Sequence, residues 1–234
     1  MVRDLSRSES YYKTYIEKKS VRIKKIEEVL NSVISQRGES DEGARNGFIF
    51  LTNHYLDQLI AKYSAGYPLK EIKVHFKDVV NRMEKSWNGE NYEQMLWTLS
   101  IGVMLDVEDT LFNRLVGLVR SYELQDGLLE FLIQGKLHGS ETFEGHLKFK
   151  TPYAKLVDVI NAENKVENLR KYLEKYWYNG HSDSGWHDTH KHPDPIYSGY
   201  WSFESGAVAK ILGLDDSSLK DVPYYPYDMV HYKG

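Results

Sequence analysis

The sequence predicts an all-α protein, a helical bundle of about eight to ten helices in two packed helical subdomains. Apolar residues recur at spacings of three, four or seven along most of the chain, which is the period of amphipathic helices. No alternation of apolar and polar residues, the pattern of a half-buried strand, extends beyond four residues. The 234 residues suffice for a sizeable core. We place a domain boundary near Tyr122 to Asp126, which gives an N-terminal helical domain, 1–122, and a C-terminal helical domain, 123–234.

The chain is expected to begin with one long amphipathic helix. Ser6 and Glu9 have the spacing of a capping box, and an apolar stripe follows them to about Gln36. Lys19 stands where the stripe expects an apolar residue, so packing of this helix on its own domain is favoured over a coiled-coil homodimer, which stays open as the alternative. The basic residues of the helix could contact phosphate, although their alternation with the stripe favours a solvated face. These residues are Lys18, Lys19, Arg22, Lys24 and Lys25.

The other elements follow from breaks and caps. A second helix has its apolar face over residues 48–63 and is predicted to end at Gly66, after which Pro68 suits the first turn of a third helix. Pro223 and Pro226 disfavour a helix near the C-terminus, so the last residues are expected to be extended or in turns. The remaining helical segments are 91–105, 108–120, 151–161, 162–177, 197–213 and a short one from Asp215.

Composition narrows the classes of protein. No apolar run is long enough to cross a bilayer and no apolar segment follows the first basic residues, so neither a membrane protein nor a secretory signal is expected. The absence of cysteine excludes disulfides, thiolate catalysis and thiolate zinc sites, and it fits a cytoplasmic protein. Residues 1–37 carry nine Lys and Arg against five Asp and Glu, whereas residues 181–234 carry four against eight. The acidic C-terminal part disfavours direct binding of nucleic acid there.

One stretch, 177–194, concentrates residues that could carry chemistry: four histidines, three aspartates and two tryptophans. His187 and His190 have an i, i+3 spacing, and Asp183 or Asp188 could add oxygen ligands. A glycine and a proline place the stretch in a loop, where nothing fixes the ligand geometry, and the H-E-x-x-H pattern is absent. We therefore expect no bound metal and no cofactor.

An enzymatic alternative uses His187 and Asp188 as a metal-binding dyad, as in all-α phosphohydrolases. A metal ion would lower the pKa of a bound water and hold phosphate. The further ligands that such a dyad needs would come from glycine-rich or terminal segments, which disfavours this metal-dependent phosphohydrolase. They would be His138, His146, Asp215 or Asp228. A G-x-S-x-G elbow, a phosphate loop and a dinucleotide fingerprint are all absent.

A structural interpretation of the same stretch starts from Glu204. Trp201 and Glu204 are three residues apart, so they share one face of the predicted helix that follows the stretch. A carboxylate on an aromatic wall needs hydrogen-bond donors. Tyrosine hydroxyls, an indole N–H or a loop histidine or serine could supply them. The stretch is then a scaffold held on the helix by polar contacts.

The C-terminal residues resemble a known family. The segments GHSDSGWHDTHKH, YSGYWSFESGAVAKILGLDDSSL and YYPYDMVHY closely resemble the C-terminal domain of the PoNi family, the immunity proteins of bacterial polymorphic nuclease toxins. The segment KYSAGYPLKEI and the helices around it resemble the N-terminal domain of that family. We interpret seven residues as the structural signature of the family: Tyr197, Gly199, Tyr200, Trp201, Glu204, Tyr225 and Pro226.

The resemblance implies an all-helical cytoplasmic protein of the toxin-producing cell, with no catalytic residues. Such a protein binds a cognate DNase toxin and blocks it. A nuclease active site is basic, because it holds phosphates, so carboxylates of an inhibitor can steer association and occupy it. The candidate carboxylates are Asp106, Glu108, Asp109, Asp215, Asp216 and Asp221. We expect stoichiometric occlusion of the toxin, with no contact to a membrane or directly to nucleic acid, and binding away from the toxin's active site stays open.

Overall fold

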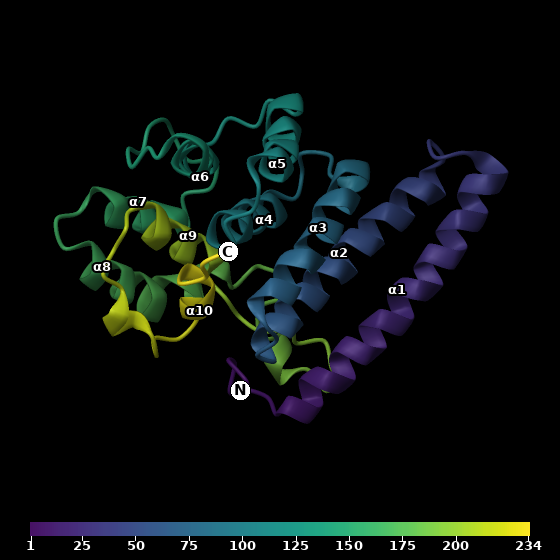
Figure 1. Cartoon of the computed structure of the whole chain (residues 1–234), viewed down its shortest axis with the longest axis horizontal. Coiled ribbons are helices and arrows are strands. Elements are labelled where there is room, and N and C mark those ends of the chain that lie inside the picture. The colour runs from purple at the N-terminus through teal and green to yellow at the C-terminus, as the bar shows by residue number, and fades with distance from the viewer. The chain divides into compact units, whose positions relative to one another are not determined.

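The computed structural model describes residues 1–234 and contains ten α-helices and no β-strand, so the all-α prediction is confirmed (Figure 1). No helix combines the length and the apolar character that crossing a membrane requires. The helices are α1 Glu9–Arg37, α2 Glu42–Ser64, α3 Leu69–Ser86, α4 Tyr92–Met104, α5 Asp109–Ser121, α6 Gly127–His138, α7 Tyr153–Asn161, α8 Lys165–Lys171, α9 Phe203–Ile211 and α10 Tyr227–Val230.

The chain forms two compact units. Unit 1 consists of Met1–Glu90 and Asp188–Gly199, and unit 2 consists of Asn91–His187 and Tyr200–Gly234. Each unit contains residues from both sides of residue 122, so the two units do not divide at the predicted domain boundary. That boundary stays a prediction. The histidine-rich stretch is split between them, because its first part belongs to unit 2 and its second part to unit 1.

Unit 1 is built on α1, α2 and α3, which pack in order with α2 in the middle. The apolar face of α3 is fully buried and includes Phe76 and Met83. On α1, Lys19 interrupts the apolar stripe as the sequence indicates, and its Nζ lies 2.5 Å from a carboxylate oxygen of Asp57 on α2. This ion pair explains how a charged residue fits on the packed face of α1.

The start of α1 differs from the predicted capping box. The helix begins at Glu9, and its N-cap is Ser8, whose Oγ accepts a hydrogen bond from the amide of Tyr11 at 3.2 Å. Ser6 is not the cap, because its own amide donates to Oδ1 of Asp4 at 2.9 Å and ties it to the preceding turn. The capping prediction at Ser6 was therefore wrong by two residues.

Unit 2 places the nearly all-buried α4 against α9, with α6 packed on both. Helix α6 is not among the predicted helical segments, because Gly127 and Gly135 disfavour a helix there. In the structure Gly127 starts the helix behind the N-cap Asp126, and Gly135 is a packing position: a Cβ there would lie 2.6 Å from Cδ1 of Ile211. Close helix approach rather than chain reversal accounts for Gly135.

Two C-terminal predictions need correction. Helix α9 begins at Phe203, so residues 197–202, which were predicted to be helical, are not. The last residues, expected to be extended or in turns, contain the single helical turn α10, with Pro226 at its N-cap position. Proline is tolerated there because the first amides of a helix have no intrahelical acceptor.

Candidate functional site

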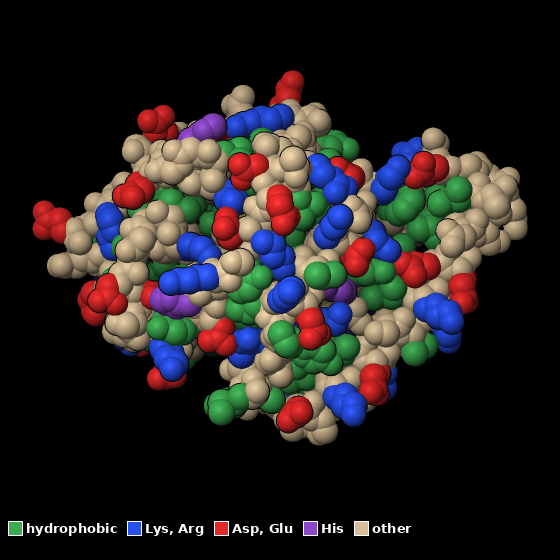
Figure 2. Space-filling model, viewed as in Figure 1, with side chains coloured by type: hydrophobic (Ala, Val, Ile, Leu, Met, Phe, Trp, Pro, Cys, Tyr) green, Lys and Arg blue, Asp and Glu red, His purple; other side chains and the backbone are tan.

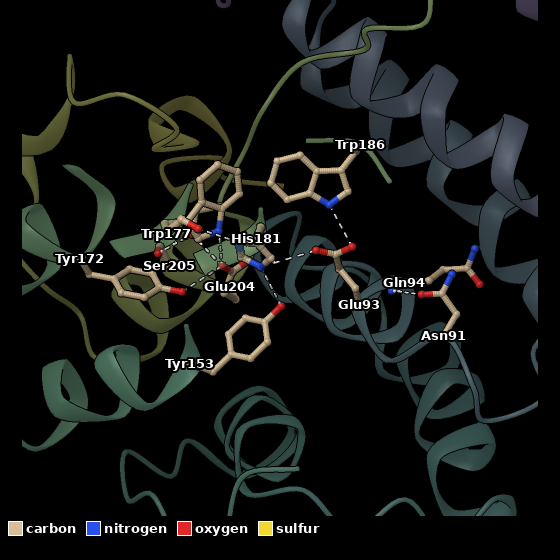
Figure 3. A network of polar contacts seen from close by, with 11 residues as sticks. Asn91, Glu93, Gln94, Tyr153, Tyr172, Trp177, His181, Trp186, Glu204 and Ser205 are labelled. Carbon is tan, nitrogen blue, oxygen red and sulfur yellow. Dashed lines mark hydrogen bonds and ion pairs between the residues drawn. The ribbon is translucent and has the colours of Figure 1, made fainter. Parts of the chain in front are cut away.

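A buried carboxyl network occupies the interior of unit 2 (Figure 3). Its first centre is Glu204 on α9, which is fully buried. Its Oε1 accepts hydrogen bonds from Nε1 of Trp177 at 2.6 Å, from Oγ of Ser202 at 2.8 Å and from Oη of Tyr172 at 3.4 Å. The prediction that an indole and hydroxyls supply donors to this carboxyl is confirmed. Its Oε2 is buried without a hydrogen-bond partner, and burial raises the pKa of Glu204 to about 7.

The second centre is Glu93 on α4. Its Oε2 accepts a hydrogen bond from Nε1 of Trp186 at 2.9 Å, whereas its Oε1 is buried without a hydrogen-bond partner. Nε2 of His181 lies 3.5 Å from that Oε1. Burial raises the pKa of Glu93 to about 7, and the negative charges of Glu204 and Asp183 act in the same direction.

His181 is held on both sides of its ring. Its Nδ1 is 2.7 Å from the carbonyl oxygen of Trp177, and its Nε2 is 3.1 Å from Oη of Tyr153 on α7. A carbonyl only accepts, so Nδ1 carries the proton and Nε2 of the neutral ring accepts from the tyrosine. Burial lowers the pKa of His181, which favours this neutral form.

The local fold explains how these donors converge. After α8 the chain forms a π-helical turn, η1 (Tyr172–Trp177), in which the hydrogen-bond repeat is longer than in an α-helix. Tyr172 and Trp177, five residues apart, consequently reach the same oxygen of Glu204. The 3₁₀ turn η2 (Asn179–His181) follows after Tyr178 and positions the histidine.

The unit 2 part of the histidine-rich stretch packs through its aromatic rings. The ring of Trp186 lies 5.3 Å from that of Trp177 in a stacked arrangement and 5.3 Å from that of Tyr200. The ring of His187 stacks on that of Tyr178, with 4.2 Å between the ring centroids. These contacts support the interpretation of this part of the stretch as a scaffold.

The residues proposed as metal ligands, His187 and Asp188, belong to different units. Asp188 belongs to unit 1, where its side chain pairs with Lys191 at 2.9 Å and its φ is +60°. His187 belongs to unit 2. Groups of three or more His, Asp or Glu side chains arranged to hold a metal ion do not occur in the structure.

A second polar cluster ties the family-like residue Tyr197 into unit 1. Oδ2 of Asp4 accepts hydrogen bonds from Oη of Tyr12 at 2.8 Å and from Oη of Tyr197 at 2.5 Å. The hydroxyl of Tyr11 donates to the carbonyl of Tyr197 and accepts from its amide. Gly199 has a φ of +123°, which only glycine adopts without strain. Segment 188–199 is therefore fixed on the N-terminal part of the chain.

The remaining signature residues are buried in unit 2. Tyr200 and Trp201 are each 9% exposed. The hydroxyl of Tyr225 donates to Oδ2 of Asp216 at 2.5 Å. Pro226 packs on Gly206, where a Cβ would lie 2.6 Å from the proline Cγ. Their placement inside the units is what a structural role requires.

Three of the candidate carboxylates lie together at the junction of α4 and α5. Asp106, Glu108 and Asp109 are exposed. Nζ of Lys136 on α6 lies 2.7 Å from Oδ1 of Asp106 and 3.5 Å from Oδ1 of Asp109. Glu108 is the N-cap residue of α5, but its side chain makes no capping hydrogen bond. We call these three residues the junction carboxylates.

The other three candidates do not form one surface. Asp215 and Asp221 are exposed, but Asp216 is only 1% exposed and accepts hydrogen bonds from Tyr225 and from Nε2 of His231. Asp216 is therefore an internal acceptor, and its choice as a partner-binding residue is corrected. Sequence reasoning could not separate it from Asp215, because adjacent residues of a turn point in different directions.

A pocket that the sequence did not indicate lies between the C-terminal end of α5 and the start of α6. Its volume is about 710 Å³. Its lining includes Arg120, which pairs with Glu130 at 2.7 Å, and the exposed carboxylates of Glu123 and Glu144. Glu123 and Glu144 flank helix α6 in the sequence, and both line this pocket. On the face shown in Figure 2, Asp and Glu side chains alternate with Lys and Arg without forming one large acidic field.

Comparison with known proteins matches the chain in two parts. The family model described as PoNe immunity protein (PoNi), N-terminal, matches residues 3–117, and the model described as PoNe immunity proteins (PoNi), C-terminal, matches residues 124–229. A search of curated proteins found no match. Among solved structures, the chain is similar to the crystal structure of protein PA2201 from Pseudomonas aeruginosa, with a TM-score of 0.61 and 16% identity, over 92% of this chain and 87% of that chain. That likeness shows the fold, and the two family models together show that the chain belongs to the PoNi family of PoNe immunity proteins.

Proposed function

We propose that this immunity protein binds a cognate DNase toxin in the cytoplasm of the producing cell and neutralises it by stoichiometric occlusion, without catalysis. Membership of the PoNi family carries the proposal. The histidine-rich stretch supports a binding protein rather than a hydrolase, because His187 stacks on Tyr178 and Asp188 pairs with Lys191. No cofactor, membrane or direct nucleic-acid contact enters this function, and a homodimer through α1 stays an alternative assembly.

The junction carboxylates are the surface that we propose for the toxin. They are exposed, they lie between the end of α4 and the first residue of α5, and a nuclease site that holds phosphates is complementary to them in charge. Asp215 and Asp221 are a second proposed acidic contact. Binding to the toxin away from its active site is the competing arrangement of the same function.

Co-purification with the product of the adjacent gene, followed by titration of DNase activity, tests the function. We expect a one-to-one complex and complete inhibition at one equivalent of this protein. Inhibition by far less than one equivalent would indicate catalysis, and elemental analysis showing about one zinc, iron or manganese per chain, with activity lost in His187→Ala, would support the phosphohydrolase instead.

Neutralising the junction carboxylates should slow association with the toxin. In the triple variant Asp106→Asn, Glu108→Gln, Asp109→Asn the association rate constant should fall about tenfold at low salt, and its dependence on salt should become flatter, because electrostatic steering is lost. Lys136 also loses its two ionic partners in this variant and adds unfavourable positive charge. Stopped-flow or surface-based kinetics over a range of salt concentrations measure both effects.

A matched control changes the same number of charges elsewhere on unit 2. Glu141, Glu163 and Glu167 are exposed, and their triple glutamine variant should leave the association rate almost unchanged. Equal rates for both triple variants would remove the junction carboxylates from the interface. The double variant Glu123→Gln, Glu144→Gln applies the same measurement to the pocket between α5 and α6.

A further inference from the structure

Unit 2 contains two carboxyl groups that are each only half satisfied: Glu204 is fully buried, and Glu93 is three-quarters buried. One oxygen of Glu204 accepts three hydrogen bonds and one oxygen of Glu93 accepts one, whereas the second oxygen of each is inaccessible to solvent and has no hydrogen-bond partner. An ionised carboxylate with an unpartnered buried oxygen is strongly unfavourable. Protonation lowers that cost, because the group is then neutral. The geometry therefore favours the protonated form of both carboxyl groups.

The state of His181 strengthens this requirement. Its Nδ1–H donates to the carbonyl of Trp177, so its Nε2 has one lone pair, which faces Oη of Tyr153 at 3.1 Å, and Oε1 of Glu93 lies 3.5 Å from the same nitrogen. A nitrogen lone pair close to an ionised carboxylate oxygen is repulsive. One proton between Oε1 of Glu93 and Nε2 of His181 resolves the conflict, either on the carboxyl with a neutral ring or on the ring with an ionised carboxyl.

We propose that Glu93, His181 and Glu204 form a proton-binding site that fastens the unit 2 part of the histidine-rich stretch to α4 and α9, so that this protein binds protons when it folds. The site goes beyond toxin binding and does not depend on it. Trp186 and Trp177, at the two ends of this segment, donate to the two carboxyls directly (Figure 3). Ionisation of the two carboxyls favours their hydration, which competes with the hydrogen bonds from Trp177 and Trp186 and so weakens the attachment of residues 177–187.

The charged and titratable groups around the site act in known directions. Three groups act on Glu93: His181 at the end of η2, Asp183 just after it, and Glu204 on α9. Toward Glu204, α7 presents Tyr153 and η1 presents Tyr172, both with pKa values raised by burial, so both remain neutral. The negative charges oppose ionisation of Glu93, and the neighbouring His187 lowers the pKa of His181.

The sign of the resulting pH dependence follows from these directions. The pKa of each carboxyl is about 7 in the folded protein, above the ordinary value of 4.5. The stability that the bound protons contribute is complete below pH 4.5, is lost as the pH rises toward 7, and changes no further above that. The lowered pKa of His181 acts oppositely below its ordinary value of 6.5. A comparison of wild type with a variant that lacks one carboxyl isolates the contribution of that carboxyl.

Glu93→Gln is the variant of choice. The amide can still accept from Trp186, it can donate to Nε2 of His181, and it cannot ionise. We expect the ratio of unfolding constants, wild type over E93Q, to rise about ten- to a hundredfold between pH 5 and pH 8 in denaturant titrations, given that a quarter of this side chain is exposed. Glu204→Gln should show the same direction. Glu141→Gln, on an exposed loop residue, should show a ratio that does not change with pH.

The result that would overturn the proposal is a pH-independent ratio for both E93Q and E204Q. Should either variant fail to fold, carboxyl resonances of the wild-type protein labelled at glutamate decide the question. Two side-chain carboxyls titrating near neutral pH support the site, whereas titration of all glutamates in the ordinary range rejects it.

Discussion

Replacing Trp177 by phenylalanine should lower the free energy of unfolding by about 3 kcal/mol, one of the two largest effects that we expect from a single substitution. The indole N–H makes the shortest of the three hydrogen bonds to Glu204, at 2.6 Å. Phenylalanine removes this donor from a fully buried carboxyl. Chemical denaturation monitored by circular dichroism measures the loss.

The same substitution should change the pH dependence of stability. The Trp177 hydrogen bond lowers the pKa of Glu204 against the effect of burial, so its loss raises that pKa further. The hydrogen bond stabilises the ionised form of Glu204, which predominates in the wild-type protein only above pH 7. The destabilisation of the variant should therefore be larger at pH 8 than at pH 5. A loss that is equal at both pH values would show that only packing was removed.

Trp97 on α4 offers a matched control. Its Nε1 is buried but has no hydrogen-bond partner, and its ring packs near Trp186 and Phe203. Trp97→Phe removes the same atoms without removing a hydrogen bond, so it should cost about 1 kcal/mol through lost packing alone. If the two tryptophan variants lost equal stability, the hydrogen bond to Glu204 would have no net value.

Replacing Asp4 by alanine should cost about 3 kcal/mol and release segment 188–199 from unit 1. The Asp4 carboxylate accepts from the buried hydroxyls of Tyr12 and Tyr197 and from the amide of Ser6. Alanine leaves all three donors without this acceptor, and a buried donor without an acceptor is costly. Denaturation measures the stability, and limited proteolysis measures cleavage within 188–199.

Two further variants test how much of this loss comes from the hydrogen bonds of the Asp4 carboxylate. Tyr197→Phe removes one of the three hydrogen bonds and should cost less than Asp4→Ala, while Glu9→Ala at the exposed first turn of α1 should cost under about 0.5 kcal/mol. Proteolysis of segment 188–199 that is no faster in Asp4→Ala than in Glu9→Ala would contradict the role that we assign to Asp4.

The sequence alone determined the fold class and the family. Helical periodicity is local, so α1, α2 and α3 could be predicted to within a few residues, and the motif around Glu204 identified the family. It also determined that a carboxyl at position 204 needs donors, because that requirement depends only on burial. Local patterns failed at α6, where Gly135 serves helix packing rather than a chain break.

Only the tertiary structure decided which groups meet. Glu93 and Trp186 are 93 residues apart, and Asp4 and Tyr197 are 193 residues apart, so no spacing rule could pair them. It also separated Asp216 from its exposed neighbour Asp215 by burying one side chain of a turn. The physical reason is common to these cases: hydrogen bonding and the pKa of a carboxyl depend on what surrounds it in space, and the chain fixes those surroundings only when it packs.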